Sequence, residues 1–254
     1  MSTTTVSSAS TDKTSGTGTR IQSVSVPVRL ADGTKVILRP IARSDSENIR
    51  TGLLSMSPES RYHRFFTCAP GLSKAQLRYL TEVDQVNHVA WVAIAAEPTA
   101  AAGLGVARFV RMPDQPAIAE FSFAVIDAMQ RKGLGRLFLA LLHILAAERG
   151  VGILRGTCLP ENDAVVSWLC GLGAEYRGYA EGTIDLDLHV GRSPERSAPS
   201  GSSAERFARA LDHLGRALAG ARECCAHPER RCPTPANKNH RRARRWDSDP
   251  KLPI

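Results

Sequence analysis

Short runs of apolar residues follow one another through the middle of the chain, between residues 88 and 126. They read "HVAWVAIAA", "GLGVARFVR" and "AIAEFSFAVI", and breaks that contain Pro, Gly or Asp separate them. Apolar runs of this length are typical of β-strands, so they predict a meander of three strands. Nearer the start, "VSVPVRL" and "TKVILRPI" flank Asp32-Gly33 and predict a β-hairpin.

The spacing of apolar residues becomes helical after residue 133. Six of them follow i, i+3, i+4 spacing and form one wide apolar face: Leu134, Leu137, Phe138, Leu141, Leu142 and Leu145. A strand "GILRGTCL", a helix "ENDAVVSWLCGLG" and a last strand "GTIDLDLHV" come next. A strand, a crossover helix and a further strand imply one parallel pair inside an otherwise antiparallel sheet. The pattern predicts a mixed α/β (α+β) domain with flanking helices.

Three shorter helices are predicted between the hairpin and the meander. Ser44 with Glu47 has the spacing of a capping box and begins a helix that runs to about Met56. Ser57-Pro58 begins the second helix, and Ser73 with Gln76 begins the third.

Composition divides the 254 residues into three parts. We interpret residues 1–21, rich in Ser and Thr, as a disordered leader, residues 22–190 as the ordered domain, and residues 191–254 as a basic tail. From residue 191 onward 14 Lys and Arg face 7 Asp and Glu, so the tail carries +7 of the net +8. Within the tail, residues 203–225 predict an amphipathic helix that docks on its own domain or on another copy, which makes an oligomer possible.

The remaining composition excludes several classes of protein. No secretory signal and no membrane-spanning run are evident, so we expect a cytoplasmic protein that does not enter a membrane. The Arg- and Pro-rich end of the tail could bind nucleic acid weakly, but a solvated tail is the commoner case. The six cysteines match no metal-binding frame, so we predict reduced thiols and no metal.

The stretch "QRKGLG" lies at the turn from the strand "AIAEFSFAVI" into the long helix. The first main-chain N–H groups of a helix have no intrahelical partner, and two glycines let an anion approach them closely. The adjacent cations would meet the anion's edge. The segment has neither a P-loop pattern nor a three-glycine dinucleotide pattern, and a plain helix cap with solvated basic residues is the alternative.

The same stretch resembles the Q/R-x-x-G-x-G/A loop of the GNAT superfamily of acetyl-CoA-dependent N-acetyltransferases. The segments "LPENDAVVSWLCGLGAEYR", "SPESRYHRFF" and "LTEVDQVNHVAWVA" extend this resemblance over roughly residues 26–190, toward the bacterial protein-lysine acetyltransferase (Pat-type) branch. The resemblance implies acetyl-CoA as cosubstrate, held between two splayed parallel strands. The implied coenzyme contacts are Ala124, Val125, Ile126, Gln130, Arg131, Lys132, Gly133, Leu134, Gly135, Arg136 and Asn162.

The resemblance also implies a catalytic base, Glu120, in the strand before the loop. Alternation places Glu120 on one face with Ser122 and Ala124. The alternative is a glutamate at a strand end, in water or in a salt bridge. Many relatives carry a tyrosine that protonates the departing thiolate, and this chain has Leu169 at that position.

We therefore predict direct acetyl transfer to a primary amine, for which the resemblance favours a protein lysine. Tyr62, His63 and Phe65 fall where the family lines its acceptor channel, although such aromatic residues are more often core. A small-molecule amine or a protein N-terminus remains open as acceptor. A second hypothesis is an acyl-CoA-binding sensor or adaptor without turnover, and a third is a nucleic-acid-binding protein that uses the tail.

Overall fold

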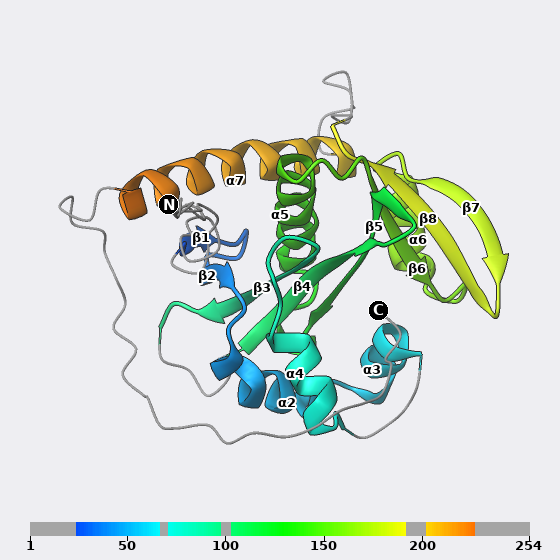
Figure 1. Cartoon of the computed structure of the whole chain (residues 1–254), viewed down its shortest axis with the longest axis horizontal. Helices are drawn as coiled ribbons and strands as arrows, with labels where there is room; N and C mark the ends of the chain where they lie inside the picture. The colour runs from blue at the N-terminus through cyan, green and yellow to red at the C-terminus, as the bar shows by residue number, and fades with distance from the viewer. Residues whose placement is uncertain (1–23, 67–70, 98–102, 192–201, 227–254) are drawn as a thin grey trace, which may run out of the picture.

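A single eight-stranded sheet forms the centre of the computed structural model, which describes residues 24–66, 71–97, 103–191 and 202–226 (Figure 1). The order of strands across it is β1-β2-β3-β4-β5-β6-β8-β7. The strands are β1 (Val26–Arg29), β2 (Lys35–Pro40), β3 (His88–Ala95), β4 (Gly103–Met112), β5 (Gln115–Val125), β6 (Ile153–Cys158), β7 (Glu175–Ala180) and β8 (Thr183–His189).

The strand pairing confirms the hairpin, the meander and the parallel pair. All neighbours are antiparallel except β5 and β6, which pair in parallel from Ile118↔Ile153 to Glu120↔Arg155. The mixed, mostly antiparallel sheet predicted from the sequence is therefore observed.

Helices cover both faces of this sheet. They are α2 (Ser46–Ser55), α3 (Pro58–Phe65), α4 (Lys74–Thr81), α5 (Leu134–Glu148), α6 (Asp163–Cys170) and α7 (Ser203–Ala226), with short 3-10 helices η1 (Arg43–Asp45) and η2 (Asp127–Met129). α5 and α6 lie on the face of β5 that carries Phe121 and Phe123, since Phe123 contacts Trp168 of α6. α3 lies on the opposite face, where Arg64 donates a hydrogen bond to Ser122. Among the described residues no helix is both long enough and apolar enough to span a bilayer.

Two details of the sequence prediction were wrong. Ser44 does not cap the first helix: it lies inside η1, and Asp45 precedes α2. The Asp45 carboxylate is buried, and hydrogen bonds from the Ala42 N–H and from both terminal nitrogens of Arg39 offset the cost of burying its charge. The proposed partner, Glu47, instead binds Arg50 on the surface.

Strand β7 was also missed. It forms the outer edge of the sheet, and five of its six residues are exposed, including Tyr176 and Tyr179. Because neither face of the strand is buried, its sequence lacks the apolar alternation by which strands are found.

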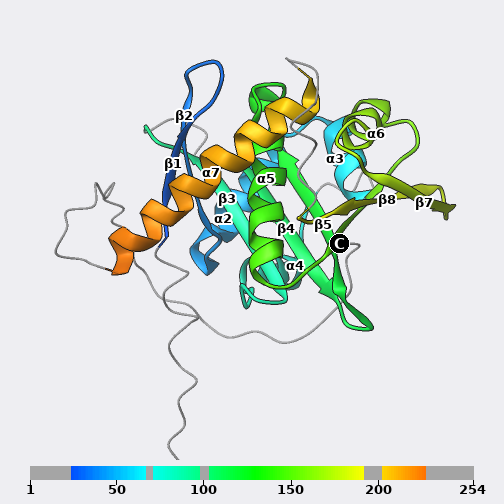
Figure 2. The same ribbon diagram turned by 90° about the horizontal axis from the view of Figure 1, so that it is seen from above.

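The predicted amphipathic stretch forms α7, which crosses α5 on the side away from the sheet (Figure 2). Phe207, Leu214 and Leu218 are buried against the core, and the Phe207 ring meets His143 of α5 edge-on. Each such burial contributes roughly 1.5–3 kcal/mol. Of the two alternatives for this helix, the structure therefore has docking on its own domain.

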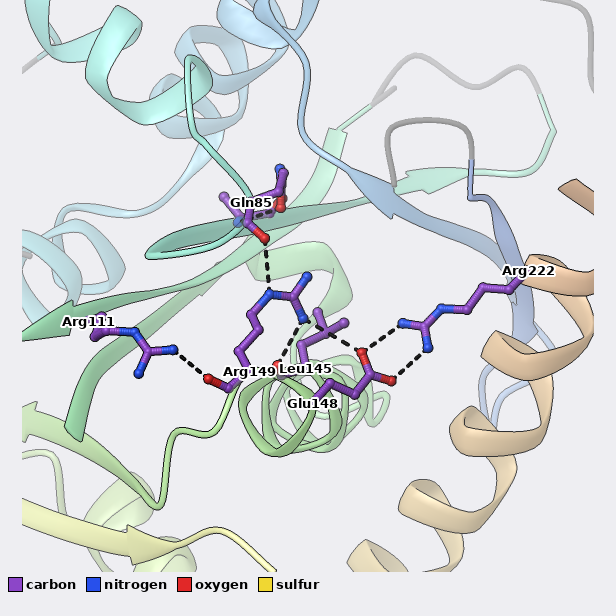
Figure 3. A network of polar contacts seen from close by, with 7 residues as sticks. Gln85, Arg111, Leu145, Glu148, Arg149 and Arg222 are labelled. Carbon is purple, nitrogen blue, oxygen red and sulfur yellow. Dashed lines mark hydrogen bonds and ion pairs between the residues drawn. The ribbon is translucent and has the colours of Figure 1, made fainter. Parts of the chain in front are cut away.

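Polar contacts fix the C-terminal end of α5 between the sheet and α7 (Figure 3). Arg222 of α7 binds Glu148 through both carboxylate oxygens, at 2.7 and 2.8 Å. Arg149 donates to the Gln85 carbonyl at 3.0 Å, and its own carbonyl accepts from Arg111 at 2.6 Å. The opposite, N-terminal end of α5 faces the candidate site.

Candidate active site

The parallel strands β5 and β6 separate just beyond Glu120. Their ladder ends at Glu120↔Arg155, while β5 continues to Val125 and β6 to Cys158. Main-chain groups of β5 that point toward β6 beyond this level have no strand partner, so they are available to a ligand. The chain thus forms a V whose apex lies at Glu120.

A cavity of about 450 Å³ occupies this V and extends to the start of α5. This volume lies within the usual range for small-molecule sites. Residues in or next to α3, β5, the loop before α5, the start of α5, β6 and α6 line the cavity. The lining residues are Met56, Ser60, His63, Arg64, Phe66, Phe121, Ser122, Phe123, Ala124, Val125, Gln130, Arg131, Gly135, Gly156, Thr157, Cys158, Asn162, Ala164, Val165 and Leu169.

The loop into α5 presents bare main-chain N–H groups to the cavity. Arg131 and Gly133 have positive φ angles of 59° and 93°, and α5 begins directly after Gly133. The main-chain hydrogen bonds found here are donated by Met129 and Gln130, and then by Leu137. The amides of the residues between are left without such a bond. A Cβ atom at Gly133 would contact only the Arg136 side chain, at 3.9 Å, so the approach to these amides is open.

Several cations surround the same loop. Arg131 lines the cavity, and Arg136 has a buried Nε without a hydrogen-bond partner. Burial lowers the pKa of Arg136, and the nearby Arg206 of α7 lowers it further. Lys132 turns instead toward the β1–β2 hairpin, where its Nζ lies 3.4 Å from Asp32. Unpaired amides, the helix dipole and these charges together suit a polyanion such as a pyrophosphate.

A group of short hydrogen bonds fixes α3 beside the loop. The Asp127 carboxylate accepts from the Ser57 N–H at 2.7 Å and from the Ser60 hydroxyl at 2.6 Å. The Gln130 side chain donates to the Ser60 hydroxyl and to the Val125 carbonyl. Gln130 therefore lines the cavity while its amide nitrogen joins three elements, which orients the loop rather than leaving that nitrogen free for a ligand.

Glu120 is a half-buried carboxylate at the apex of the V. Burial raises its pKa above the ordinary value and the Asp185 carboxylate raises it further, while Arg155 on the neighbouring strand opposes both. Arg155 is itself held by Asp187 through two hydrogen bonds of 2.7 and 2.9 Å. A carboxylate with a raised pKa is suited to accepting a proton near neutral pH.

The structure separates the predicted coenzyme residues into two groups. Ala124, Val125, Gln130, Arg131, Gly135 and Asn162 line the cavity, and the Asn162 side chain makes no capping hydrogen bond to α6. Ile126, Lys132, Gly133, Leu134 and Arg136 adjoin it without lining it, and the side chains of Ile126 and Leu134 are buried in the core.

The catalytic candidate and the acceptor candidates also differ in position. Glu120 precedes the lining residue Phe121 in β5 but does not itself line the cavity. His63 lines it, Tyr62 is exposed at the surface, and Phe65 packs against the core.

Sequence reasoning missed Arg64, Ser122 and Ser60 as cavity residues. The signal for Arg64 was present, because "SPESRYHRFF" places a cation one helical turn after Ser60. The contact of Arg64 with β5 depends on how α3 docks, and a local pattern does not show that.

Comparisons with known proteins agree with this geometry. No family model matches the chain. The acetyltransferase Pat of Mycolicibacterium smegmatis is 32% identical over 165 residues, which cover 65% of this chain and 49% of that protein. The acetyltransferase PA5475 of Pseudomonas aeruginosa is 26% identical over 144 residues, 57% of this chain and 77% of that protein. This chain thus spans about half the length of the first of these relatives and about three quarters of the second.

Among solved structures, the GNAT domain of S. lividans PAT matches with a TM-score of 0.59 and 28% identity, over 65% of this chain and 96% of that one. The mixed sheet with its one parallel pair is thus the fold of a GNAT domain. The chain has the fold of this GNAT domain, and its sequence is similar to the Pat-type acetyltransferases.

Proposed function

We propose that this protein transfers an acetyl group directly from acetyl-CoA to a primary amine, with a protein lysine as the first candidate acceptor. The observation that carries the proposal is the end of the parallel ladder at Glu120, with an open cavity directly beyond it. The proposal combines a site for the thioester, a site for the phosphates of the coenzyme, and a base where β5 and β6 separate.

The coenzyme would enter the V with its pyrophosphate on the amides of residues 131–136. Arg131 and Arg136 would neutralise its charge, and the side chain of Asn162 would meet the pantetheine arm from the start of α6. The arm would run along Phe123 to Val125, whose unpaired main-chain groups would bind its amides and polarise the thioester carbonyl.

Glu120 would receive the proton of the attacking amine. A lysine with pKa near 10.4 is neutral in only about one molecule in 2,500 at pH 7, so a positioned base is useful. Since Glu120 adjoins the lining residue Phe121 in the chain but does not itself line the cavity, the proton would pass through one water molecule. The carbon–sulfur bond then breaks, and the thioester's sulfur leaves with the electron pair.

A thiol-release assay tests the proposal, with acetyl-CoA and a panel of lysine peptides, N-terminal peptides and small amines. We expect release that depends on an amine and falls at least a hundredfold in Glu120→Gln, because general-base catalysis contributes about 10²–10⁴-fold. Glu223→Gln is the matched control, since Glu223 is exposed on α7 and distant from the site. Equal rates in both variants would contradict the role of Glu120.

The same assay separates the second hypothesis, an acyl-CoA-binding sensor or adaptor. Tight acetyl-CoA binding without thiol release for any amine, in the wild type as in Glu120→Gln, would favour that hypothesis over an enzyme. The acceptor itself would be identified by mass spectrometry of products acetylated with and without the protein.

A further inference from the structure

Arg64 of α3 is a largely buried cation for which the structure shows no counter-charge. Its Nη2 donates to the Ser122 hydroxyl at 2.9 Å, and its Nε is closed off from solvent with no hydrogen-bond partner. Among the described residues no carboxylate forms an ion pair with it. Leaving a buried charge without a partner costs free energy, so such a group is a candidate for a ligand contact.

A second buried cation lies beside Arg64 and increases the local positive potential. Arg108 of β4 is 2% exposed and faces Ser122 across the β4–β5 ladder. It donates to the Leu80 carbonyl and contacts the His88 ring nitrogen, and its Nε also has no partner. Burial lowers the pKa of Arg64 to about 10 and that of Arg108 to about 9, so both remain charged at neutral pH.

The position of Arg64 indicates which anion it meets. It lines the cavity from the face of β5 that carries Glu120 and Ser122. Arg131 lines the cavity at the other end, in the loop before α5, where the phosphates would lie. In the reaction proposed above, the thioester would lie between β5 and β6 beside Ser122, so the anion formed there would be the thiolate of the departing coenzyme.

The cavity offers few other groups for this thiolate. In the part of the chain that the structure describes, no tyrosine lines it, and Leu169 lies on the α6 side. Burial raises the pKa of the Cys158 thiol to about 11, so Cys158 is a poor proton donor. Among the described lining residues, His63 is the other titratable group at this end.

We propose that Arg64 is a catalytic residue that stabilises the departing coenzyme A thiolate. The proposal rests on the acetyltransferase function proposed above. The amine nitrogen forms its bond to the acetyl carbon, the carbon–sulfur bond breaks, the electron pair stays on sulfur beside the Arg64 guanidinium, and the amine's proton goes to Glu120. No acid is then needed at the sulfur.

The direct test is the titration of coenzyme A bound to the protein, followed by the ultraviolet absorbance of its thiolate. The complex with desulfo-coenzyme A is subtracted to remove the protein's own thiols. A free thiol titrates near pH 8.5. We expect the bound thiol to titrate at least one pH unit lower in the wild type, near the free value in Arg64→Gln, and between them in Arg64→Lys.

Matched variants separate this role from a structural one. Arg61→Gln removes a neighbouring cation of α3 that does not line the cavity, and we expect it to leave the thiol titration unchanged. His63→Gln should also leave it unchanged. If His63→Gln raises the thiol's pKa and Arg64→Gln does not, the assignment to Arg64 is wrong. Unchanged affinity for desulfo-coenzyme A shows that a variant is folded.

Turnover gives an independent readout. Arg64→Gln should lower kcat at least tenfold with little change in KM for the acceptor, and Arg64→Lys should restore part of it. A rise in acceptor KM with an unchanged thiol titration would overturn the proposal, because Arg64 would then bind an anionic acceptor. If the wild type releases no thiol with any amine, the acetyltransferase function fails, and the bound-thiol titration still decides whether Arg64 stabilises a thiolate.

Discussion

Gly133 offers the sharpest test of the phosphate site, because a matched glycine lies at the other end of the same helix. Gly133 precedes α5 with φ of 93°, and Gly150 follows it with φ of 71°. An added Cβ atom has open space at both positions. Substitution by glutamate therefore imposes similar backbone strain, about 1–2 kcal/mol, at either glycine. Only at Gly133 does the new carboxylate face the proposed phosphates.

The electrostatic cost at Gly133 follows from Coulomb's law. A carboxylate about 6 Å from each of two phosphate charges costs about 0.7 kcal/mol per pair in bulk water and about 2.8 kcal/mol at an effective dielectric constant of 20. The two pairs together cost about 1.4–5.5 kcal/mol, which weakens binding by about 10- to 10,000-fold.

Isothermal titration calorimetry with coenzyme A measures this loss, and urea unfolding measures the strain. We expect Gly133→Glu and Gly150→Glu to lose similar stability, and only Gly133→Glu to lose affinity. The loss should shrink at high salt, because ions screen the repulsion. Equal coenzyme affinity in the two variants would refute the placement of the pyrophosphate at this loop.

Three further predictions concern stability. The pKa of Glu120 is raised in the folded protein, so its ionised form destabilises the fold above that pKa. Glu120→Gln should therefore raise the melting temperature at pH 7 and change it little at pH 4. A lower melting temperature of the variant at pH 7 would contradict the burial of this carboxylate. Burial and Arg108 lower the pKa of His88 from 6.5 to about 4, so the unfolded chain binds this proton before the folded protein does as the pH falls. Urea unfolding should therefore show a loss of stability of at most about 3 kcal/mol between pH 6.5 and 4 that His88→Gln lacks. The same loss in both proteins would refute this prediction. Leu214 of α7 is fully buried against the core, so Leu214→Ala should cost about 2–5 kcal/mol of unfolding free energy. Leu54→Ala, at a side chain that is 51% exposed, should change stability by less than about 0.5 kcal/mol. Similar losses in urea unfolding would mean that α7 is not packed.

The features that could be predicted from the sequence are those set by local pattern. The short apolar runs of β3 to β5 predicted the meander, and the helical spacing after Gly133 followed by a further strand predicted the long helix and the parallel pair, because each of these elements buries apolar residues of its own. Strand β7 buries no face and was missed. The cap at α2 was misassigned because the buried Asp45 is held by Arg39 of β2, which adjacent residues do not reveal.

The site was predicted in part for the same reason. The loop from Gln130 to Arg136 is local, so its shape could be anticipated from two glycines and a following helix. The approach of Arg64 to Ser122 joins residues 58 positions apart. It depends on the Asp127 carboxylate, which fixes the start of α3. Such a contact follows from the tertiary structure alone.

A crystal structure of the protein with acetyl-CoA tests the central claim most directly. We predict phosphate oxygens within about 3 Å of the main-chain nitrogens of residues 133–136, which is hydrogen-bonding distance, and the thioester between β5 and β6 at the level where their ladder ends beside Glu120. A coenzyme bound elsewhere, with the V between β5 and β6 closed by the protein's own side chains, would contradict the account.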